Sequence, residues 1–162
     1  MNMAGVSIED RKVAVKALER AKETDGPAAA LELEDGRIIT GKTTNLLGAS
    51  AALLLNVLKE LAGIDHDLHI ISPQSIEPIQ KLKVDYLKSK NPRLHTDEVL
   101  IALSASAADS PEARLALSQL PKLDGCQAHT SVMLSDVDIK IFKKLGVQLT
   151  CEAVYEHSHL YH

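Results

Sequence analysis

A short segment stiffened by proline, Asn91-Pro92-Arg93-Leu94-His95, places a cation and an imidazole just before an apolar helix expected at 96–108. A helix start offers unpaired backbone N–H groups and the positive end of the helix dipole, so cationic side chains fixed beside it favour an anion. We therefore expect Arg93 to bind an anionic ligand and His95 to act catalytically as a proton donor. In the alternative interpretation the segment is an ordinary turn, where Arg93 covers a surface and His95 packs beside the helix cap.

A second group of polar side chains, Lys42, Thr43 and Asn45, follows a predicted strand and precedes a buried helix. Such a position suits one phosphate or carboxylate, with Lys42 and Arg93 as anion clamps. The alternative is a plain helix start with a solvated lysine. Residues 36–43 also match the phosphate-loop pattern literally, but the residues between its two glycines are strand formers, and Gly36 is needed for a hairpin turn. We interpret that match as chance.

Histidine supplies the remaining candidates for chemistry. His129 falls in a predicted core strand and is a second candidate proton donor, although a lone histidine there is more often a hydrogen-bonded interior residue. His157, His159 and His162 lie at the end of the chain without an acidic or cysteine partner at structural spacing, so we expect no metal site. The cofactor is unknown. The chain has no Gly-x-Gly-x-x-Gly fingerprint, so NAD(P)H would need another mode of binding.

Composition limits the partners. The 162 residues are 45% apolar and 25% charged, values typical of a globular domain, and we take 1–162 as a single domain. The formal charge of −4 and the 2% of aromatic residues give no reason to expect nucleic acid or an acidic membrane. No charged-then-apolar leader or membrane-spanning run is present, so we expect a cytoplasmic protein. Its two cysteines, Cys126 and Cys151, are expected to be reduced and structural.

Periodicity predicts the elements that position these residues. An Asp-Gly pair between two β-forming runs predicts a hairpin, and the last third of the chain predicts a βαβ unit with parallel strands. We expect an α/β fold with a mixed sheet of about five strands covered by helices. Thr96 is expected to cap its helix. The expected helices are 7–25, 46–61, 75–87 with an interruption at Pro78, 96–108, 111–120 and 135–145, and the expected strands are 29–33, 37–40, 68–71, 128–134 and 147–154.

Several runs of the chain carry a family resemblance, among them Asp10-Arg11-Lys12-Val13-Ala14-Val15, Thr40-Gly41-Lys42, Leu82-Lys83-Val84-Asp85 and Asn91 to His95. They resemble, in order and over essentially the whole chain, the C-terminal domain of a bacterial domain-of-unknown-function family, number eighteen-forty-six. The resemblance specifies the family and implies no reaction. Family members are much longer and carry an N-terminal glycine-rich, phosphate-loop-like segment. Because this sequence lacks that segment, we interpret the chain as either a dissected domain or a short gene.

Three classes of function follow. The first is a domain that binds, or supports catalysis on, an anionic or phosphorylated small molecule. The second is a free-standing enzyme, for example an NAD(P)H-dependent oxidoreductase acting on a small polar carbonyl compound. The third is an assembly module, because the helices at 46–61 and 99–108 are apolar on all sides, which favours a homo-oligomer, a dimer or larger.

Overall fold

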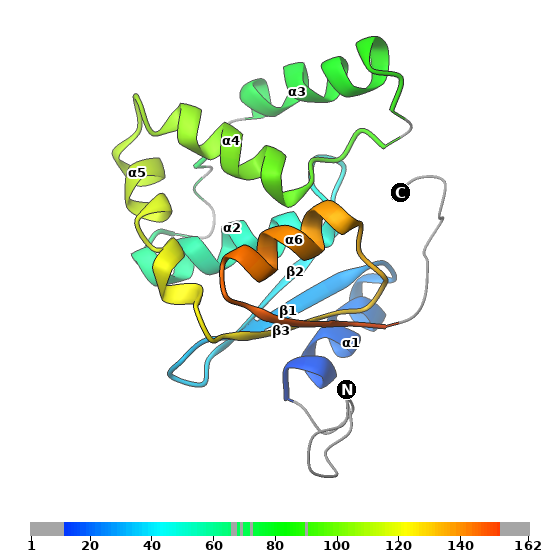
Figure 1. Cartoon of the computed structure of the whole chain (residues 1–162), viewed down its shortest axis with the longest axis vertical. Coiled ribbons are helices and arrows are strands. Elements are labelled where there is room, and N and C mark those ends of the chain that lie inside the picture. Colours follow the sequence, from blue (N-terminus) through cyan, green and yellow to red (C-terminus); the bar gives the residue numbers. More distant parts are fainter. Residues whose placement is uncertain (1–11, 66–67, 69, 72, 90, 153–162) are drawn as a thin grey trace.

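Four described strands form one mixed sheet in the order β2-β1-β3-β4 (Figure 1). β1 (Ala28–Glu32) lies antiparallel to both β2 (Ile38–Lys42) and β3 (Gln127–Thr130), and β3 lies parallel to β4 (Gln148–Cys151). The α/β class and the mixed sheet are therefore confirmed, with four strands in place of about five. The computed structural model describes residues 12–65, 68, 70–71, 73–89 and 91–152.

The first two strands form the hairpin that the sequence predicts. Gly36 adopts a left-handed φ of 92°, which favours glycine, and its N–H donates a hydrogen bond of 2.9 Å to the carbonyl of Leu33. β2 begins two residues later and runs through Lys42. The stretch that matches the phosphate-loop pattern is thus a turn and a strand, so its N–H groups cannot wrap a phosphate.

The sheet carries helices on both faces because β1 is apolar on both. Ala30 packs against Val13 and Ala17 of α1 (Lys12–Thr24), which lies below the sheet in Figure 1. Ala29 and Leu31 point to the opposite face and belong to the main core, under α2 (Ala49–Ala62) and α6 (Asp136–Lys144). The residues before Lys12, where the first helix was expected to begin, lie outside the described part.

α2 is the central helix of the core. Ten of its 14 residues are buried, and it ends at Gly63, whose φ of 71° is the left-handed helix end that glycine favours. A Cβ on Gly41 would lie 2.3 Å from the backbone nitrogen of Leu53, so α2 packs directly on the β2 backbone. The chain itself covers most of α2, which removes one of the two reasons for an assembly module. Homo-oligomerisation stays a prediction.

The strand expected at 68–71 is wrong. The described residues of this segment, Leu68, Ile70 and Ile71, form bends and pair with no strand. Ile70 and Ile71 are each 4% exposed and belong to the main core. Their burial explains why the run is apolar, and a short apolar run does not by itself distinguish a strand from a packed loop.

The helix expected at 75–87 begins earlier and is not interrupted where it was predicted to be. α3 (Pro73–Lys81) contains Pro78 and continues into a π-helical turn, Leu82–Tyr86. α4 (Thr96–Ser106) and α5 (Pro111–Leu117) follow, and Figure 1 shows all three on the same side of the sheet as α2. Ser110 caps α5 by accepting a hydrogen bond of 3.1 Å from the N–H of Ala113.

The last third forms the predicted βαβ unit, in which α6 connects the parallel strands β3 and β4. Both cysteines are free thiols, and burial raises the pKa of the Cys126 thiol. No described helix is long and apolar enough to cross a bilayer.

Candidate functional site

The two segments singled out in the sequence lie side by side. The N–H of Leu94 donates to the carbonyl of Leu46 at 3.0 Å, and the N–H of Gly48 donates to the carbonyl of Leu94 at 3.2 Å. Arg93 strengthens the contact, since its Nε donates to the carbonyl of Thr44 at 2.6 Å. This pairing of extended backbone also explains why α2 begins at Ala49 and not at the expected residue 46.

Three helices begin around one small cavity of about 40 Å³, which we call the small cavity. α2 contributes its first turn, α4 contributes its N-cap residue His95, and α6 contributes its N-cap residue Ser135. Each helix start directs backbone N–H groups and positive dipole charge toward this place. The residues that line the small cavity are Pro27, Thr43, Gly48, Ala49, Ser50, Asn91, Arg93, Leu94, His95, Val132, Met133, Leu134, Ser135 and Asp138.

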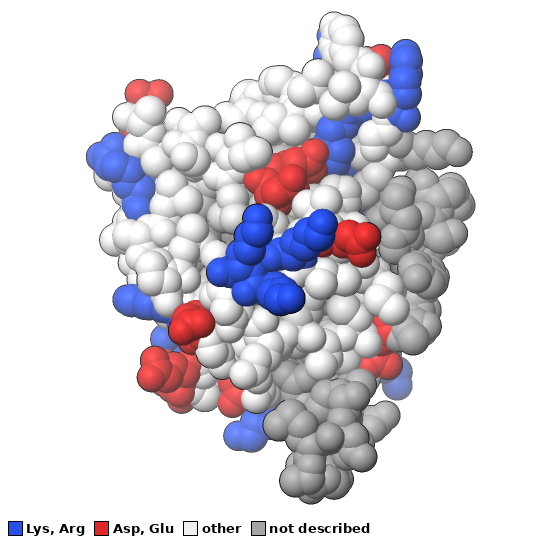
Figure 2. All heavy atoms as spheres, in the orientation of Figure 1, with Lys and Arg blue, Asp and Glu red and all other residues white. Residues whose placement is uncertain are grey.

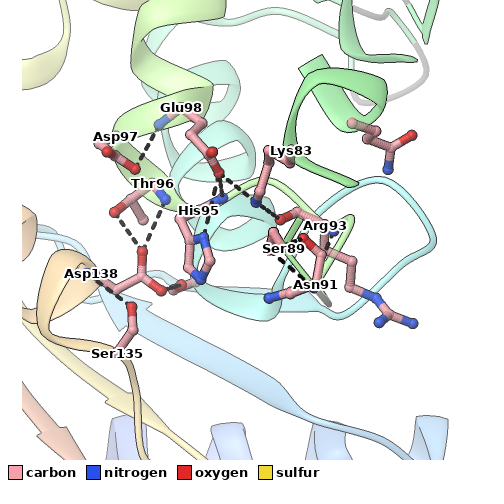
Figure 3. Close-up of polar contacts among 12 residues, drawn as sticks. Lys83, Ser89, Asn91, Arg93, His95, Thr96, Asp97, Glu98, Ser135 and Asp138 are labelled. Carbon is pink, nitrogen blue, oxygen red and sulfur yellow. Dashed lines mark hydrogen bonds and ion pairs between the residues drawn. The ribbon is translucent and has the colours of Figure 1, made fainter. Parts of the chain in front are cut away.

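Asp138 joins the three helix starts. It is 4% exposed, and its Oδ1 accepts hydrogen bonds from the N–H of Thr96 at 2.9 Å and from the Thr96 hydroxyl at 2.7 Å (Figure 3). Its Oδ2 accepts a hydrogen bond of 3.0 Å from the hydroxyl of Ser50. A buried carboxylate is stable here because donors from two helix starts compensate its desolvation.

His95, and not Thr96, caps α4. The backbone N–H of His95 donates to Glu98 Oε1 at 2.8 Å, and the His95 ring Nδ1 lies 3.4 Å from the same oxygen. Lys83 Nζ donates to this oxygen at 2.8 Å and to the carbonyl of Arg93 at 2.6 Å, from the π-helical turn (Figure 3). The buried Lys83 therefore fixes both the start of α4 and the segment before it.

These contacts shift the pKa values of both Glu98 and His95. Burial opposes ionisation of Glu98, but hydrogen bonds from His95 and Lys83 outweigh it and lower the pKa of Glu98 to about 2. The hydrogen bond with Glu98 raises the pKa of His95 against the effect of burial, and the negative charge of Asp138 adds to this rise. His95 is therefore more readily protonated than an exposed histidine.

The structure brings together only some of the residues proposed from the sequence. Thr43, Arg93 and His95 line the small cavity. The Arg93 guanidinium nevertheless points away from His95 and Asp138 (Figure 3). Lys42 and Asn45 line a neighbouring cavity of about 510 Å³, which we call the large cavity.

His129 lies apart from both cavities. It is 0% exposed and sits opposite Ala30 in the sheet, on the face that α1 covers. Its Nδ1 lies 2.6 Å from the hydroxyl of Thr150, and its Nε2 lies 2.7 Å from Glu152 Oε2. His129 is thus a hydrogen-bonded interior residue. This role was expected from the sequence as the alternative to a role as proton donor.

The large cavity has an apolar lining with cations from three different elements. Arg20 comes from α1, Lys42 from β2 and Lys59 from α2, and no acidic residue is among the described residues that line it. Sequence reasoning missed Arg20, Lys59 and Asn56. Asn56 and Lys59, three positions apart in a largely apolar helix, were the available signal. The lining residues are Arg20, Thr40, Gly41, Lys42, Thr44, Asn45, Leu46, Leu47, Ala52, Leu55, Asn56, Lys59, Ile70, Ile71 and Ile76.

The family model described as "Domain of unknown function DUF1846, C-terminal" matches residues 9–161. The chain belongs to this family. It is 60% identical over 161 residues to a UPF0371 protein of Corynebacterium efficiens and 48% identical over 161 residues to one of Streptococcus uberis. Both alignments cover 99% of this chain but only 32% and 33% of the relatives, so the chain spans about a third of their length.

Other polar groups of this DUF1846 C-terminal domain lie outside the two cavities. The exposed lysines Lys140, Lys143 and Lys144 belong to the outer surface of α6, where Figure 2 shows basic side chains gathered. They line neither cavity. Among the described residues, no three His, Cys, Asp or Glu side chains are grouped to hold a metal ion, and the C-terminal histidines lie outside that part.

Proposed function

We propose that this domain binds a small anionic molecule with an apolar portion, and that the large cavity is its site. One observation carries the proposal: three cations and no acidic residue among the described lining residues, in a chain whose formal charge is −4. A positive concavity on an acidic protein favours negatively charged ligands.

The size and lining of the cavity support a ligand of metabolite size. A volume of about 510 Å³ falls within the range of small-molecule sites, roughly 300–1,000 Å³. Leucines, isoleucines and an alanine are seven of its 15 lining residues, and Asn56 is held in place by a hydrogen bond of 2.9 Å from its amide to the carbonyl of Thr40. Aliphatic walls combined with cationic and amide side chains suit an alkyl or acyl chain that ends in a carboxylate or phosphate.

In the longer relatives this domain makes up about a third of the chain. We propose that it serves there as a ligand-binding or catalytic-support domain for the remaining part. The chemistry of the large cavity requires no proton donor, and neither His95 nor His129 lines it.

Calorimetric titration with octyl phosphate, octanoate and octanol tests the proposal, because the three compounds share an apolar chain and differ in charge. The two anions should bind and octanol should bind much more weakly. Lys42→Gln should weaken binding of the anions about two- to fivefold, the effect of losing one exposed cation. Lys140→Gln removes another exposed lysine, which lies outside the cavity, and should leave binding unchanged.

Ala52→Leu provides a second, independent variant, because the larger side chain would occupy part of the large cavity. It should abolish binding of both anions while thermal melting shows a folded protein. The proposal is wrong if neither anion binds at millimolar concentration, or if Lys42→Gln and Lys140→Gln behave alike.

A further inference from the structure

We propose that the small cavity is a separate binding site for a tetrahedral oxyanion of the phosphate class. This site is distinct from the large cavity and does not depend on the function proposed for it. The proposal rests on the donors that surround the small cavity and on one side-chain amide nitrogen that forms no hydrogen bond within the described part of the chain.

The first donors come from α2, a helix of 14 residues whose start is not capped by a side chain. Its N-cap residue is Gly48, which has no side chain to accept hydrogen bonds from the first turn. The other two starts are served from within the domain: Ser135 accepts from the N–H of Asp138, and Asp138 accepts from the N–H of Thr96. The α2 start is therefore the one of these three that lacks a resident acceptor among the described side chains.

The second observation is Asn91, which is 5% exposed and lines the small cavity. Its Oδ1 accepts a hydrogen bond of 3.0 Å from the N–H of Arg93, which fixes the orientation of the amide. Within residues 12–152 as described, no hydrogen bond is formed by its Nδ2. Asn91 and His95 line the same cavity (Figure 3), so the amide N–H groups are available to an oxygen placed there.

His95 supplies a third donor when it is protonated. Its Nδ1 is directed at Glu98, and the second ring nitrogen lies on the side of Asp138 (Figure 3). The charged groups around the ring are Glu98 on α4, Lys83 on the π-helical turn and Asp138 on α6, while Arg93 lines the same cavity. Protonated His95 offers Nε2–H to a bound oxyanion, whereas neutral His95 with Nδ1–H directed at Glu98 offers a lone pair.

Asp138 sets the charge balance of the site. Both of its oxygens already accept hydrogen bonds from Thr96 or Ser50. Its negative charge opposes the binding of an anion nearby. An oxyanion in the small cavity therefore depends on His95 protonation, on the Asn91 amide and on the start of α2. A tetrahedral oxyanion suits this arrangement because its oxygens can accept from several directions at once.

Phosphorus NMR and calorimetric titration with inorganic phosphate test the site in the intact chain. Sulfate, a tetrahedral oxyanion whose charge stays constant over this range, should bind more tightly at about pH 5.5 than at about pH 8, since an unperturbed histidine titrates near pH 6.5 and the pKa of His95 is higher. Asn91→Asp keeps the Oδ1 acceptor for Arg93 and replaces the amide NH₂ by a negative oxygen. It should lower phosphate affinity at least tenfold, with thermal melting as the check on folding.

Two further variants separate this site from a structural role and from the large cavity. Asp138→Asn keeps an acceptor for Thr96 and removes the negative charge, so it should tighten phosphate binding several-fold, which a purely structural role would not do. Lys42→Gln should leave phosphate binding unchanged, so the two sites can fail independently. Equal phosphate affinity in the unmodified chain and Asn91→Asp, or no binding at about pH 5.5, would overturn the proposal.

Discussion

The carboxylate of Asp138 in α6 accepts hydrogen bonds from both the backbone N–H and the hydroxyl of Thr96 in α4, 42 positions earlier in the chain. The same carboxylate also holds the hydroxyl of Ser50 in α2. One buried side chain thus positions three helix starts around the small cavity.

Replacing Asp138 by alanine should therefore destabilise the domain strongly. The change leaves two donors of Thr96 without an acceptor, so we expect a loss of about 3–5 kcal/mol in the free energy of unfolding. Asp138→Asn should cost less, about 1–2 kcal/mol, because an amide oxygen can still accept from Thr96. Urea unfolding measures both. Asp136→Ala, at an exposed position two residues earlier in α6, is the control and should change stability by less than about 0.5 kcal/mol.

Gly41→Ala should be among the most damaging single substitutions. The added Cβ would lie 2.3 Å from the backbone nitrogen of Leu53, and backbone cannot move aside as a flexible side chain can. We expect a loss of about 3 kcal/mol or more, at the upper end for overpacked sites. Gly26→Ala is the matched control, since its Cβ would meet its nearest neighbour at 4.0 Å. Similar melting temperatures for the two variants would show that α2 does not rest on β2 as described.

The free energy of unfolding should fall at acidic pH because Glu98 becomes protonated. Its folded pKa of about 2 lies below the ordinary value of 4.5, so its contribution is present above pH 4.5 and is lost as the pH falls toward 2. We expect a loss of about 2 kcal/mol over this range, after allowance for partial exposure. Glu98→Gln should flatten this part of the stability curve, measured by urea unfolding at each pH. Glu112→Gln, in the first turn of α5, should not.

Deprotonation of His95 should lower the stability of the domain as the pH rises, which is the opposite direction to the effect of Glu98. The folded pKa of His95 is raised, so its contribution is full below the ordinary value of 6.5 and is lost as the pH rises through the higher folded value. His95→Gln should remove this loss. The comparison requires urea unfolding from about pH 6 to about pH 9, and an unchanged slope in His95→Gln would contradict the assignment.

His129→Leu separates an interior role from a ligand-binding one. The substitution leaves Thr150 and Glu152 without the two ring nitrogens, so we expect a loss of about 2–4 kcal/mol in stability. Binding of octyl phosphate and of inorganic phosphate should stay unchanged in the folded variant. Loss of binding with unchanged stability would instead support His129 as a functional residue.

Local signals predicted much of the fold. The hairpin turn at Asp35-Gly36 and the helices expected at 111–120 and 135–145 were visible in the sequence because each depends on a few neighbouring residues. The prediction of a strand at 68–71 was wrong because Ile70 and Ile71 are apolar for another reason: they pack into the main core from a loop. Which distant residues they pack against cannot be read from the local sequence.

The candidate site was predicted in part for the same reason. Arg93, His95 and Thr43 precede helix starts, and helix starts that meet at one place bring such residues together. The sequence could not show that Lys42 and Asn45 line a different cavity, nor that Arg20 from α1 joins them there. Those relationships depend on how distant elements pack, and no local pattern encodes them.

The segment 43–48 forms part of the lining of both cavities, with Thr43 and Gly48 at the small one and residues 44–47 at the large one. The same stretch of backbone would therefore contact the ligands of both cavities. If a ligand in one cavity shifts this segment, the affinity of the other cavity for its own ligand changes. Thermodynamic linkage then requires the second ligand to change the affinity for the first by the same factor. Titrating each ligand in the presence of the other would measure that communication directly.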